Sequence, residues 1–466
     1  MKPSFYCKIL LLLMLIIPEL SFGQPYDERK EQIFKYPNGN IKSKGFVIQY
    51  KDGSLTQDGN FVSFYENGQI ESKGSFLYGY KYGNWTTWSN QGQIIRSSNY
   101  IEDIPNGTDS VWFQNGQLAV AMIFNNGIPD GKYYEGFDNG KTKMHGKYLL
   151  GKPVGEWKTW HQNGMIAQIS NYKDSFLHGK LTSWYENGKI QDEMYFNKGN
   201  IQGTRTLWYE NGNKLLEEEW KMNKLNGLRR SWYGNKKIES SVMWKDSLKH
   251  GKAEFWHANG QKSEEREFNN GKIVGAVNQY YENGKPKLFQ QFSNGAEDGK
   301  LNSWYPNGKV EDECEFKDGK IYGKRKKWHE NGKLFIEEYY LNNSLNGKRT
   351  LWYETGQRWK SENWTDSLRD GTFISWHKNG KKQGEINYVK GQEIGTFHLW
   401  HDNGQIEVEG YYNYGKLDGV HKGWYKNGDV EFEHYFKDGK REGKSFDWNE
   451  KGVVKETIYS DGVRIK

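Results

Sequence analysis

Glycines and aromatic residues recur along this chain with a period of 24 residues. Most of the repeating units contain an Asn-Gly pair, and we call the second residue of that pair the turn glycine. Turn glycines stand at positions 68, 92, 116 and 140, and the same step continues to position 452, with Lys236 filling one place. Such a period is the sequence signature of a repeat protein, in which each unit buries its apolar surface on its neighbours.

Three further positions keep the same step. A glycine stands nine residues before the turn glycine, as in Gly59 and Gly83, and an aromatic ring stands eight residues after it, as in Phe76 and Tyr100. A tryptophan stands four residues before it in fourteen units, and we call these residues the Trp ladder. The Trp ladder consists of Trp88, Trp112, Trp160, Trp184, Trp208, Trp232, Trp256, Trp304, Trp328, Trp352, Trp376, Trp400, Trp424 and Trp448.

Each unit has two turn signals and therefore two strands. A two-residue Asn-Gly loop between apolar runs predicts a β-hairpin with a type I′ turn, in which both residues have positive φ. Eleven residues later a second signal recurs, as in Asn126-Gly127 and Asp246-Ser247. The residues between the turns suffice for a strand and leave no room for a helix. The sequence therefore predicts an all-β fold, an elongated single-layer antiparallel sheet of tandem 24-residue hairpins that resembles a solenoid.

The predicted two-residue loop determines which residues face each other across the hairpin. The glycine nine residues before the turn glycine then lies opposite the ring eight residues after it, and we expect the ring to cover the glycine. The Tyr three residues before the turn glycine is expected on that same face, opposite an isoleucine such as Ile70 or Ile190. The Trp ladder is expected on the other face, and a one-residue error in the loop would exchange the two faces.

The start of the chain differs from the rest. Lys2 and Lys8 precede an unbroken apolar run at 9–17, and Ser21 and Gly23 match the small residues of a cleavage site. This pattern predicts a removable signal peptide. A membrane anchor is the alternative, but the apolar run is far shorter than the ~20 residues that a spanning helix needs.

We therefore expect three segments, a signal peptide at 1–23, a short linker at 24–30 and an array of about 18 repeats at 31–466. The mature protein is expected to be exported to the periplasm or the cell exterior. It is not expected to be a lipoprotein, because Cys7 precedes the apolar run. Cys314 is then the single cysteine, so no intrachain disulfide can form. Other units place Met, Val or Ile at its position, and we interpret Cys314 as an apolar filler rather than an intermolecular thiol.

Composition agrees with a thin sheet. Only 35% of the residues are hydrophobic while 16% are aromatic, which is unlike the aliphatic composition of a thick core. The net charge of +7 is spread over 66 basic and 59 acidic residues, without the long basic run of a nucleic-acid-binding arm. We expect no nucleic-acid partner, and no transmembrane segment after signal cleavage.

No residue pattern predicts an enzyme, a cofactor or a metal site. Five of the histidines stand three residues before the turn glycine, where other units have Tyr, so we interpret them as substitutes for Tyr. His377, His398 and His401 are the histidines that come nearest to a metal-binding set. Carboxylate pairs such as Asp192-Glu193 indicate cross-strand ion pairs rather than acid-base catalysis. We find no nucleophile elbow, phosphate-binding loop or zinc signature.

The repeated unit reads Gly-x-x-x-x-Trp-Tyr-x-Asn-Gly-x-Ile, then an acidic residue, a ring and Asp-Gly-Lys, as at 178–199 and 418–439. It resembles the MORN repeat, in the bacterial variant of the YwqK-like antitoxin-component family. The resemblance runs from about Glu31 to the C-terminus, with departures such as Gly136 and Tyr280 in place of Trp. It implies the same single-layer sheet, but it does not specify a function, because fold does not imply function.

The Trp ladder is the candidate binding face. Regularly spaced rings suit a protein partner or a sugar ring, although most of them are expected simply to cover the sheet. The main hypothesis is an exported, non-enzymatic scaffold for protein-protein interaction. The alternatives are a carbohydrate- or envelope-binding protein that uses the Trp face, and an antitoxin- or immunity-like protein of a toxin-antitoxin system. The candidate residues are Trp160, Trp184, Trp208, Trp232, Trp304, Trp328, Trp352, Trp376, Trp400 and Trp424.

Overall fold

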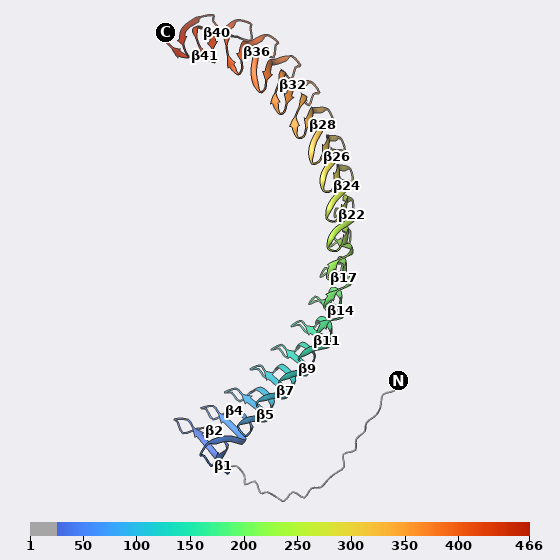
Figure 1. Ribbon diagram of the computed structural model, residues 1–466, viewed down its shortest axis with the longest axis vertical. Helices are drawn as coiled ribbons and strands as arrows, with labels where there is room; N and C mark the ends of the chain where they lie inside the picture. Colours follow the sequence, from blue (N-terminus) through green and yellow to red (C-terminus); the bar gives the residue numbers. More distant parts are fainter. Residues whose placement is uncertain (1–25) are drawn as a thin grey trace, which may run out of the picture. The chain divides into compact units, whose positions relative to one another are not determined.

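The computed structural model describes residues 26–466, so the expected signal peptide at 1–23 lies outside the described residues. The described residues form 44 strands and no helix. Consequently none of them belongs to a helix that could cross a membrane. The chain divides into two units, Met1–Asn200 and Ile201–Lys466. Each unit is an elongated single layer of hairpins lying side by side (Figure 1), which confirms the predicted fold class.

The strands of the first unit follow the chain in order and pair antiparallel with their neighbours. Residues 26–30 of the expected linker already belong to the first strand. The strands are β1 (Tyr26–Lys35), β2 (Ile41–Tyr50), β3 (Leu55–Phe64), β4 (Ile70–Leu77), β5 (Tyr80–Trp88), β6 (Ile94–Ile101), β7 (Ile104–Trp112), β8 (Leu118–Asn125), β9 (Ile128–Gly136), β10 (Thr142–Leu149), β11 (Lys152–Trp160), β12 (Ile166–Lys173), β13 (Phe176–Leu177), β14 (Gly179–Trp184) and β15 (Ile190–Asn197).

The second unit continues with the same alternation of long and short strands. Strand β16 (Asn200–Ile201) begins at the last residue of the first unit. The remaining strands are β17 (Gly203–Trp208), β18 (Lys214–Lys221), β19 (Lys224–Leu225), β20 (Gly227–Trp232), β21 (Ile238–Lys245), β22 (Leu248–Trp256), β23 (Lys262–Asn269), β24 (Lys272–Tyr280), β25 (Pro286–Ser293), β26 (Ala296–Trp304), β27 (Val310–Lys317), β28 (Lys320–Trp328), β29 (Leu334–Leu341), β30 (Ser344–Leu345), β31 (Gly347–Trp352), β32 (Arg358–Thr365), β33 (Leu368–Arg369), β34 (Gly371–Trp376), β35 (Lys382–Val389), β36 (Gln392–Trp400), β37 (Ile406–Asn413), β38 (Lys416–Leu417), β39 (Gly419–Trp424), β40 (Val430–Lys437), β41 (Lys440–Arg441), β42 (Gly443–Trp448), β43 (Val454–Ser460) and β44 (Val463–Arg464).

The Asn-Gly turn is longer than predicted. The amide of Gly68 donates to the Tyr65 carbonyl at 2.9 Å, and the Tyr65 amide donates to the Gln69 carbonyl at 2.8 Å. Gly68 has a φ of 85°, whereas Asn67 is not among the residues with positive φ. This is a three-residue loop, a type I turn followed by a left-handed glycine that forms a bulge, and not the predicted type I′ turn.

The extra loop residue changes the pairing next to the turn. Phe64, not Tyr65, lies opposite Ile70, and Trp184, not Tyr185, lies opposite Ile190. The predicted Tyr–Ile pairing was therefore wrong. A bulge just beyond these pairs restores the register, so the predicted pair of Gly83 with Tyr100 is confirmed.

The two-residue turn with positive φ occurs instead at the other end of the hairpin. Asp246 and Ser247 have φ values of 49° and 65°, and they connect the directly paired Lys245 and Leu248. Both central residues are thus left-handed, which Asn, Asp and Gly adopt at the lowest steric cost. The second turn signal, rather than the first, has the type I′ character.

The glycine nine residues before the turn glycine bends its strand. Gly83 has a φ of 73°, and the pairing of β4 with β5 shifts between Lys73–Thr86 and Ser75–Tyr82. No atom lies within 4 Å of the place where a Gly83 Cβ would stand. The expectation that a ring covers this glycine was therefore wrong. Glycine is needed here because the backbone is left-handed at a bulge.

The bend encloses a narrow core whose most buried part is a single row of hairpin pairs. We call it the inner row: the residue seven positions before each turn glycine and its hairpin partner six positions after, such as Trp85 and Ser98. Trp85 is only 7% exposed, Ser98 2% and Val242 4%. Side-chain sizes along the row are complementary. A Cβ atom added to Gly410 would lie only 2.6 Å from the Phe397 ring, so the ring fills the space beside this glycine. The apolar core of this fold is thus a narrow band, because rings beside the row, such as Phe268, pack against Val242 and Ala253 of the row.

Candidate functional site

The candidate Trp residues occupy the face opposite the inner row. Each of the ten is the last residue of its strand, from Trp160 in β11 to Trp424 in β39, and each is half-buried. Consecutive 24-residue repeats are two strands apart, so successive residues of the Trp ladder are about 9.6 Å apart. We call this surface the outer face. The outer face presents partly covered rings at regular intervals along each of the two large units.

Charged side chains cover much of the outer face between the rings. Lys214 Nζ lies 5.1 Å from the Trp232 ring centre, and it also pairs with Glu217 at 2.7 Å. Lys382 lies 5.5 Å from the Trp400 ring and pairs with Glu385 at 2.6 Å. Cation–π contacts of this kind stabilise a ring in place. The flat side of these rings is therefore partly occupied by the chain's own lysines.

The adjacent carboxylates separate onto the two faces. Glu337 on the outer face lies 3.2 Å from Lys324, whereas Glu338 is buried at 4% exposure and lies 3.2 Å from Arg349. Strand alternation sends neighbouring side chains in opposite directions, so the two carboxylates cannot act together as an acid-base pair. The expected cross-strand ion pairs are present in this hairpin.

A ladder of hydrogen bonds connects the turns of neighbouring units. The Tyr65 hydroxyl donates to the Trp88 carbonyl at 2.8 Å, and His161 Nε2 lies 2.8 Å from the Trp184 carbonyl. Both rings place a donor at the same distance from the backbone, which explains why His replaces Tyr here. His401 makes the same contact with the Trp424 carbonyl at 2.8 Å.

The histidines near Trp400 are engaged separately. His377 Nε2 lies 2.7 Å from the Trp400 carbonyl, while His398 stacks on the Trp400 ring at 5.6 Å. Within residues 26–466 no group of three or more His, Cys, Asp or Glu side chains is arranged to hold a metal ion. These histidines serve as turn and ring contacts in the structure.

An aromatic hollow interrupts the regular outer surface near the turns of β28–β29 and β31–β32. It has a volume of about 430 Å³, and His329, Phe335, Tyr353 and Trp359 contribute its rings. The His329 and Phe335 rings are 4.8 Å apart, and those of Tyr353 and Trp359 are 5.7 Å apart. Glu354, Thr355 and Lys378 add polar groups, and Trp352 of the candidate face is part of its wall.

This hollow was missed in the sequence because its signal lies in a variable position. The residue three positions after the turn glycine is aromatic only at Phe335 and Trp359. Other units have a charged, polar or aliphatic residue there, such as Glu71, Ala119 or Lys143. Aromatic residues in two adjacent units at a position where no other unit has one would have identified the hollow.

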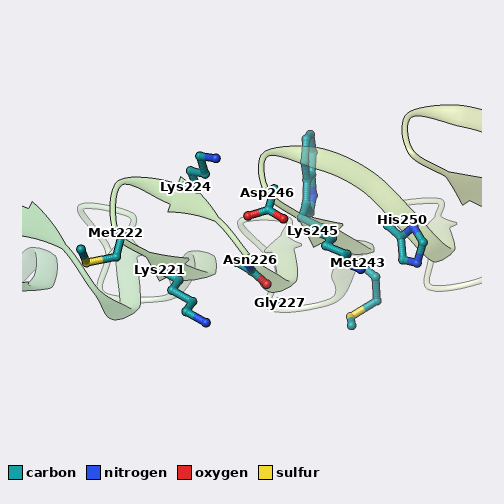
Figure 2. A pocket seen from close by; sticks show the side chains of 10 residues that line it. Lys221, Met222, Lys224, Asn226, Gly227, Met243, Lys245, Asp246 and His250 are labelled. Atoms are coloured by element: carbon teal, nitrogen blue, oxygen red, sulfur yellow. The ribbon is translucent and has the colours of Figure 1, made fainter.

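A second hollow lies at the opposite edge of the sheet, beside the turns that follow β18 and β21. It has a volume of about 630 Å³ and includes Lys221, Lys224 and Lys245. Figure 2 shows Met222 and His250 at its two ends. It is basic and open, with Asp246 as its one acidic side chain among the residues that line it.

Cys314 lies in the inner row. It is 6% exposed and forms a Cα pair with Leu301. Burial raises the pKa of its thiol to about 11, with a smaller contribution from Asp312. A thiol that stays protonated and buried is a poor nucleophile. The structure thus agrees with the interpretation of Cys314 as a filler.

Comparison with solved structures gives only distant likenesses. The crystal structures of TcdB2-TccC3 and TcdB2-TccC3-TEV are 9% and 11% identical to this chain, each with a TM-score of 0.14. The alignments cover 92% and 93% of this chain, but only 32% and 26% of the other chains. The chain therefore spans about a third or less of those proteins, and the TM-scores are too low to support a common fold. No curated protein matches the chain.

One family matches the repeats themselves. Eight segments match the MORN repeat variant, and each segment contains one turn glycine and ends at the first residue of the second turn. The matched segments are 57–78, 153–174, 177–198, 249–270, 297–318, 321–342, 369–390 and 417–438. They fall on the hairpins whose geometry is described above, in both units. Eight repeats of the MORN variant are therefore identified in this chain.

Proposed function

We propose that this chain is an exported, non-enzymatic scaffold that binds a protein partner along its outer face. This proposal is supported by a difference between the positions that recur along the chain and the positions that vary. The glycine at the position of Gly83 recurs in every repeat and forms a bulge, and the Tyr or His at the position of Tyr65 recurs in most repeats and connects the turns. The outer face instead carries rings and charges whose arrangement differs from unit to unit, which is where a specific partner can be recognised.

The chemistry of the outer face suits a protein surface. Trp and Arg are enriched among the residues that contribute most to protein-protein binding, particularly where neighbouring groups exclude water. Trp232 stands beside Lys214 and an ion-paired Arg230, whose guanidinium lies 3.5 Å from Glu217. Such a patch offers a ring together with charges of both signs. An extended partner could contact the same kind of patch in several successive units.

Cross-linking in intact cells tests the proposal. The wild-type chain should give cross-links between one partner protein and peptides that contain ladder tryptophans. A Trp304→Ala/Trp328→Ala variant should lose at least ten-fold of these products, while Tyr414→Ala, which removes a 58% exposed ring from the turn edge, should retain them. Equal cross-linking in the two variants would contradict a role for the outer face.

Export is the second part of the proposal. It rests on the pattern of residues 1–23, which predicts a signal peptide. Cell fractionation followed by sequencing of the mature N-terminus should find the protein in the periplasm or medium, beginning at or near Gln24. A cytoplasmic protein that retains its first residues would refute export without affecting the binding proposal.

The aromatic hollow favours carbohydrate binding as a second candidate function. Phe335 and Trp359 stand in adjacent units, so a glycan could contact both rings while Glu354 and Lys378 bind its hydroxyl groups. Pulldown on insoluble polysaccharides should then retain the wild-type chain and Trp232→Ala, but not Trp359→Ala. Failure of the wild-type chain to bind any polysaccharide tested would eliminate this candidate.

Membership of the YwqK-like antitoxin-component family is a further proposal, which rests on the sequence resemblance alone. It predicts that a neighbouring gene encodes a toxin. Co-expression of this chain should then restore growth of cells that produce the toxin. Unchanged toxicity with the folded chain present would reject the antitoxin role.

A further inference from the structure

One edge of the first unit carries a continuous row of exposed apolar side chains. They stand in the second turn of five successive hairpins, within residues 77–178. We call this row the apolar rim. Its side chains are 43% to 67% exposed. The apolar rim consists of Tyr78, Tyr80, Ile104, Ile128, Leu150 and Phe176.

The rim is continuous because each turn packs on the next. The site of a Gly127 Cβ lies 3.2 Å from Ile104 Cγ2, and that of Gly151 lies 3.2 Å from Ile128 Cγ2. In the second unit the same turns carry mostly Lys, Asp and Asn, as in Asp318-Gly319-Lys320. Exposed apolar residues also stand in some of these turns, as Met222, Leu368 and Tyr414 do, but more charged residues accompany them than in the rim.

The area of the rim is sufficient for a stable contact. A large side chain presents roughly 200 Å² when fully open, so six that are about half exposed present on the order of 600 Å². The exposed Leu77, Tyr82, Ile101 and Leu149 belong to the same turns and raise the total to on the order of 1,000 Å². A standard stable interface buries about 800 Å² per partner.

The order of charged and aromatic turns along the rim is self-complementary. Beginning at the N-terminal end, the first four turns are aromatic, acidic, uncharged and basic, and the fifth carries Phe176 together with Asp174. The acidic turn carries Glu102 and Asp103, the central turn holds Ile128, and the basic turn carries Lys152. If a second copy runs in the opposite direction with Ile128 at the centre, the acidic turn of each copy meets the basic turn of the other. The tyrosines at one end then meet Phe176 at the other.

We propose that two copies of this chain associate rim to rim, antiparallel, about a two-fold axis beside Ile128. A two-fold interface uses the same patch on both subunits and requires that patch to complement itself, as this order does. A parallel arrangement would place Glu102 beside its own copy and Lys152 beside its own copy. The proposal is independent of the outer face and of the identity of its partner.

Sedimentation velocity of the full-length chain tests the association. The protein concentration is about 20–50 µM, chosen for an interface of this size. The wild-type protein should sediment as a dimer. Ile128→Asp should raise the dimer dissociation constant at least ten-fold, because it places like charges at the axis. Leu248→Asp is the matched control, since Leu248 is 49% exposed at the equivalent turn position outside the rim. Circular dichroism should show that both variants remain folded.

A charge swap tests the antiparallel register. Lys152→Glu should weaken the dimer, and the added change Glu102→Lys should restore it. Glu102 is preferred to Asp103 for this swap, because the Asp103 carboxylate accepts the Lys81 amide at 2.7 Å. No rescue would overturn the register.

If the wild-type chain is monomeric at about 50 µM, the highest concentration used, the proposed dimer is overturned. The rim would then be assigned to a different kind of partner. A dimer that Ile128→Asp leaves intact would likewise overturn the rim as its interface. Neither result would alter the cross-linking expected on the outer face, so the two proposals can fail separately.

Discussion

Individual residues in the inner row are matched to their neighbours in size. The place of a Gly146 Cβ is occupied by the Trp157 ring, and in the next hairpins Leu181 and Met194 form a directly opposed pair instead. In the second unit the row includes charges, with Arg325 Nη2 at 2.6 Å from Asp312. Because the core is a narrow band on one face of a single sheet, a change of volume has few neighbours to absorb it.

We expect Gly146→Ala to destabilise the first unit by about 1–3 kcal/mol, the range for overpacking a core. In the background of Trp157→Leu, the same substitution should cost markedly less, because Leu already occupies the equivalent position at Leu181. Urea unfolding of the four proteins in this double-mutant cycle measures the coupling. Additive effects would show that the two side chains do not compete for space.

His421 should make the C-terminal hairpins sensitive to acid. Burial lowers the pKa of His421, and the neighbouring His434 and Arg441 lower it further. Its Nδ1 atom is buried without a hydrogen-bond partner among the described residues, as suits a neutral ring. The unfolded chain, with a pKa of about 6.5, binds the proton more readily than the folded chain. Stability is therefore complete above that value and decreases as the pH falls toward the lower folded pKa.

His421→Phe should remove this acid sensitivity, because Phe373 and Phe397 already occupy the equivalent position in nearby units. Hydrogen exchange of peptides within 417–441, measured at pH 7.5 and at pH 5.5 after correction for the intrinsic rate, provides the test. The wild-type protein should lose protection at the lower pH and the variant should not. Equal losses in both would assign the effect to another group.

At the scale of the element, the hairpin depends on two different turns. The loop around the turn glycine needs one left-handed residue, whereas the opposite turn has two, such as Asp246 and Ser247. Lys236 is the exception, because it adopts a φ of 72° where other units have glycine. Its amide still donates to the Tyr233 carbonyl at 2.9 Å, so the loop keeps its form at a conformational cost.

Lys236→Gly should therefore stabilise its hairpin by about 0.5–1 kcal/mol, the steric relief of a left-handed residue less the added chain entropy of glycine. Gly116→Lys is the mirror variant and should destabilise by a similar amount. Gly116 has a φ of 82° and no atom within 4 Å of its Cβ place, so only the backbone term changes. Thermal unfolding and local hydrogen exchange measure the stability of both variants. A Lys236→Gly variant that is less stable than the wild type would refute backbone strain at Lys236.

For the whole molecule, stability should be transmitted between neighbours rather than shared globally. Each hairpin contacts the hairpins before and after it, as in a one-dimensional array. Gly146→Ala should thus increase hydrogen exchange within about 118–184 and leave peptides beyond 250 unchanged. Loss of protection in both units at once would show that the chain unfolds as one cooperative body.

Much of this fold could be predicted from residues that act locally. The pair of Gly83 with Tyr100 followed from the predicted two-residue loop, and it is correct because the bulge near the turn compensates for the extra loop residue. The identity of the turn was wrong because an Asn-Gly pair is compatible with two loop lengths, and the hydrogen bond from Gly68 to Tyr65 decides between them. The aromatic hollow was missed because Phe335 and Trp359 stand at a position that differs from repeat to repeat, so the repeating pattern does not include them.

The repeat, the all-β class and the two turns per unit followed from local sequence, because left-handed glycines and short strands constrain the nearby backbone directly. The composition of the inner row, the bend at Gly83 and the division of Glu337 from Glu338 between two faces required the tertiary structure. They depend on bulges that displace the pairing, and on side chains that meet only when neighbouring hairpins lie side by side. A displacement of one residue reverses which side chains a strand buries, and no local pattern specifies it.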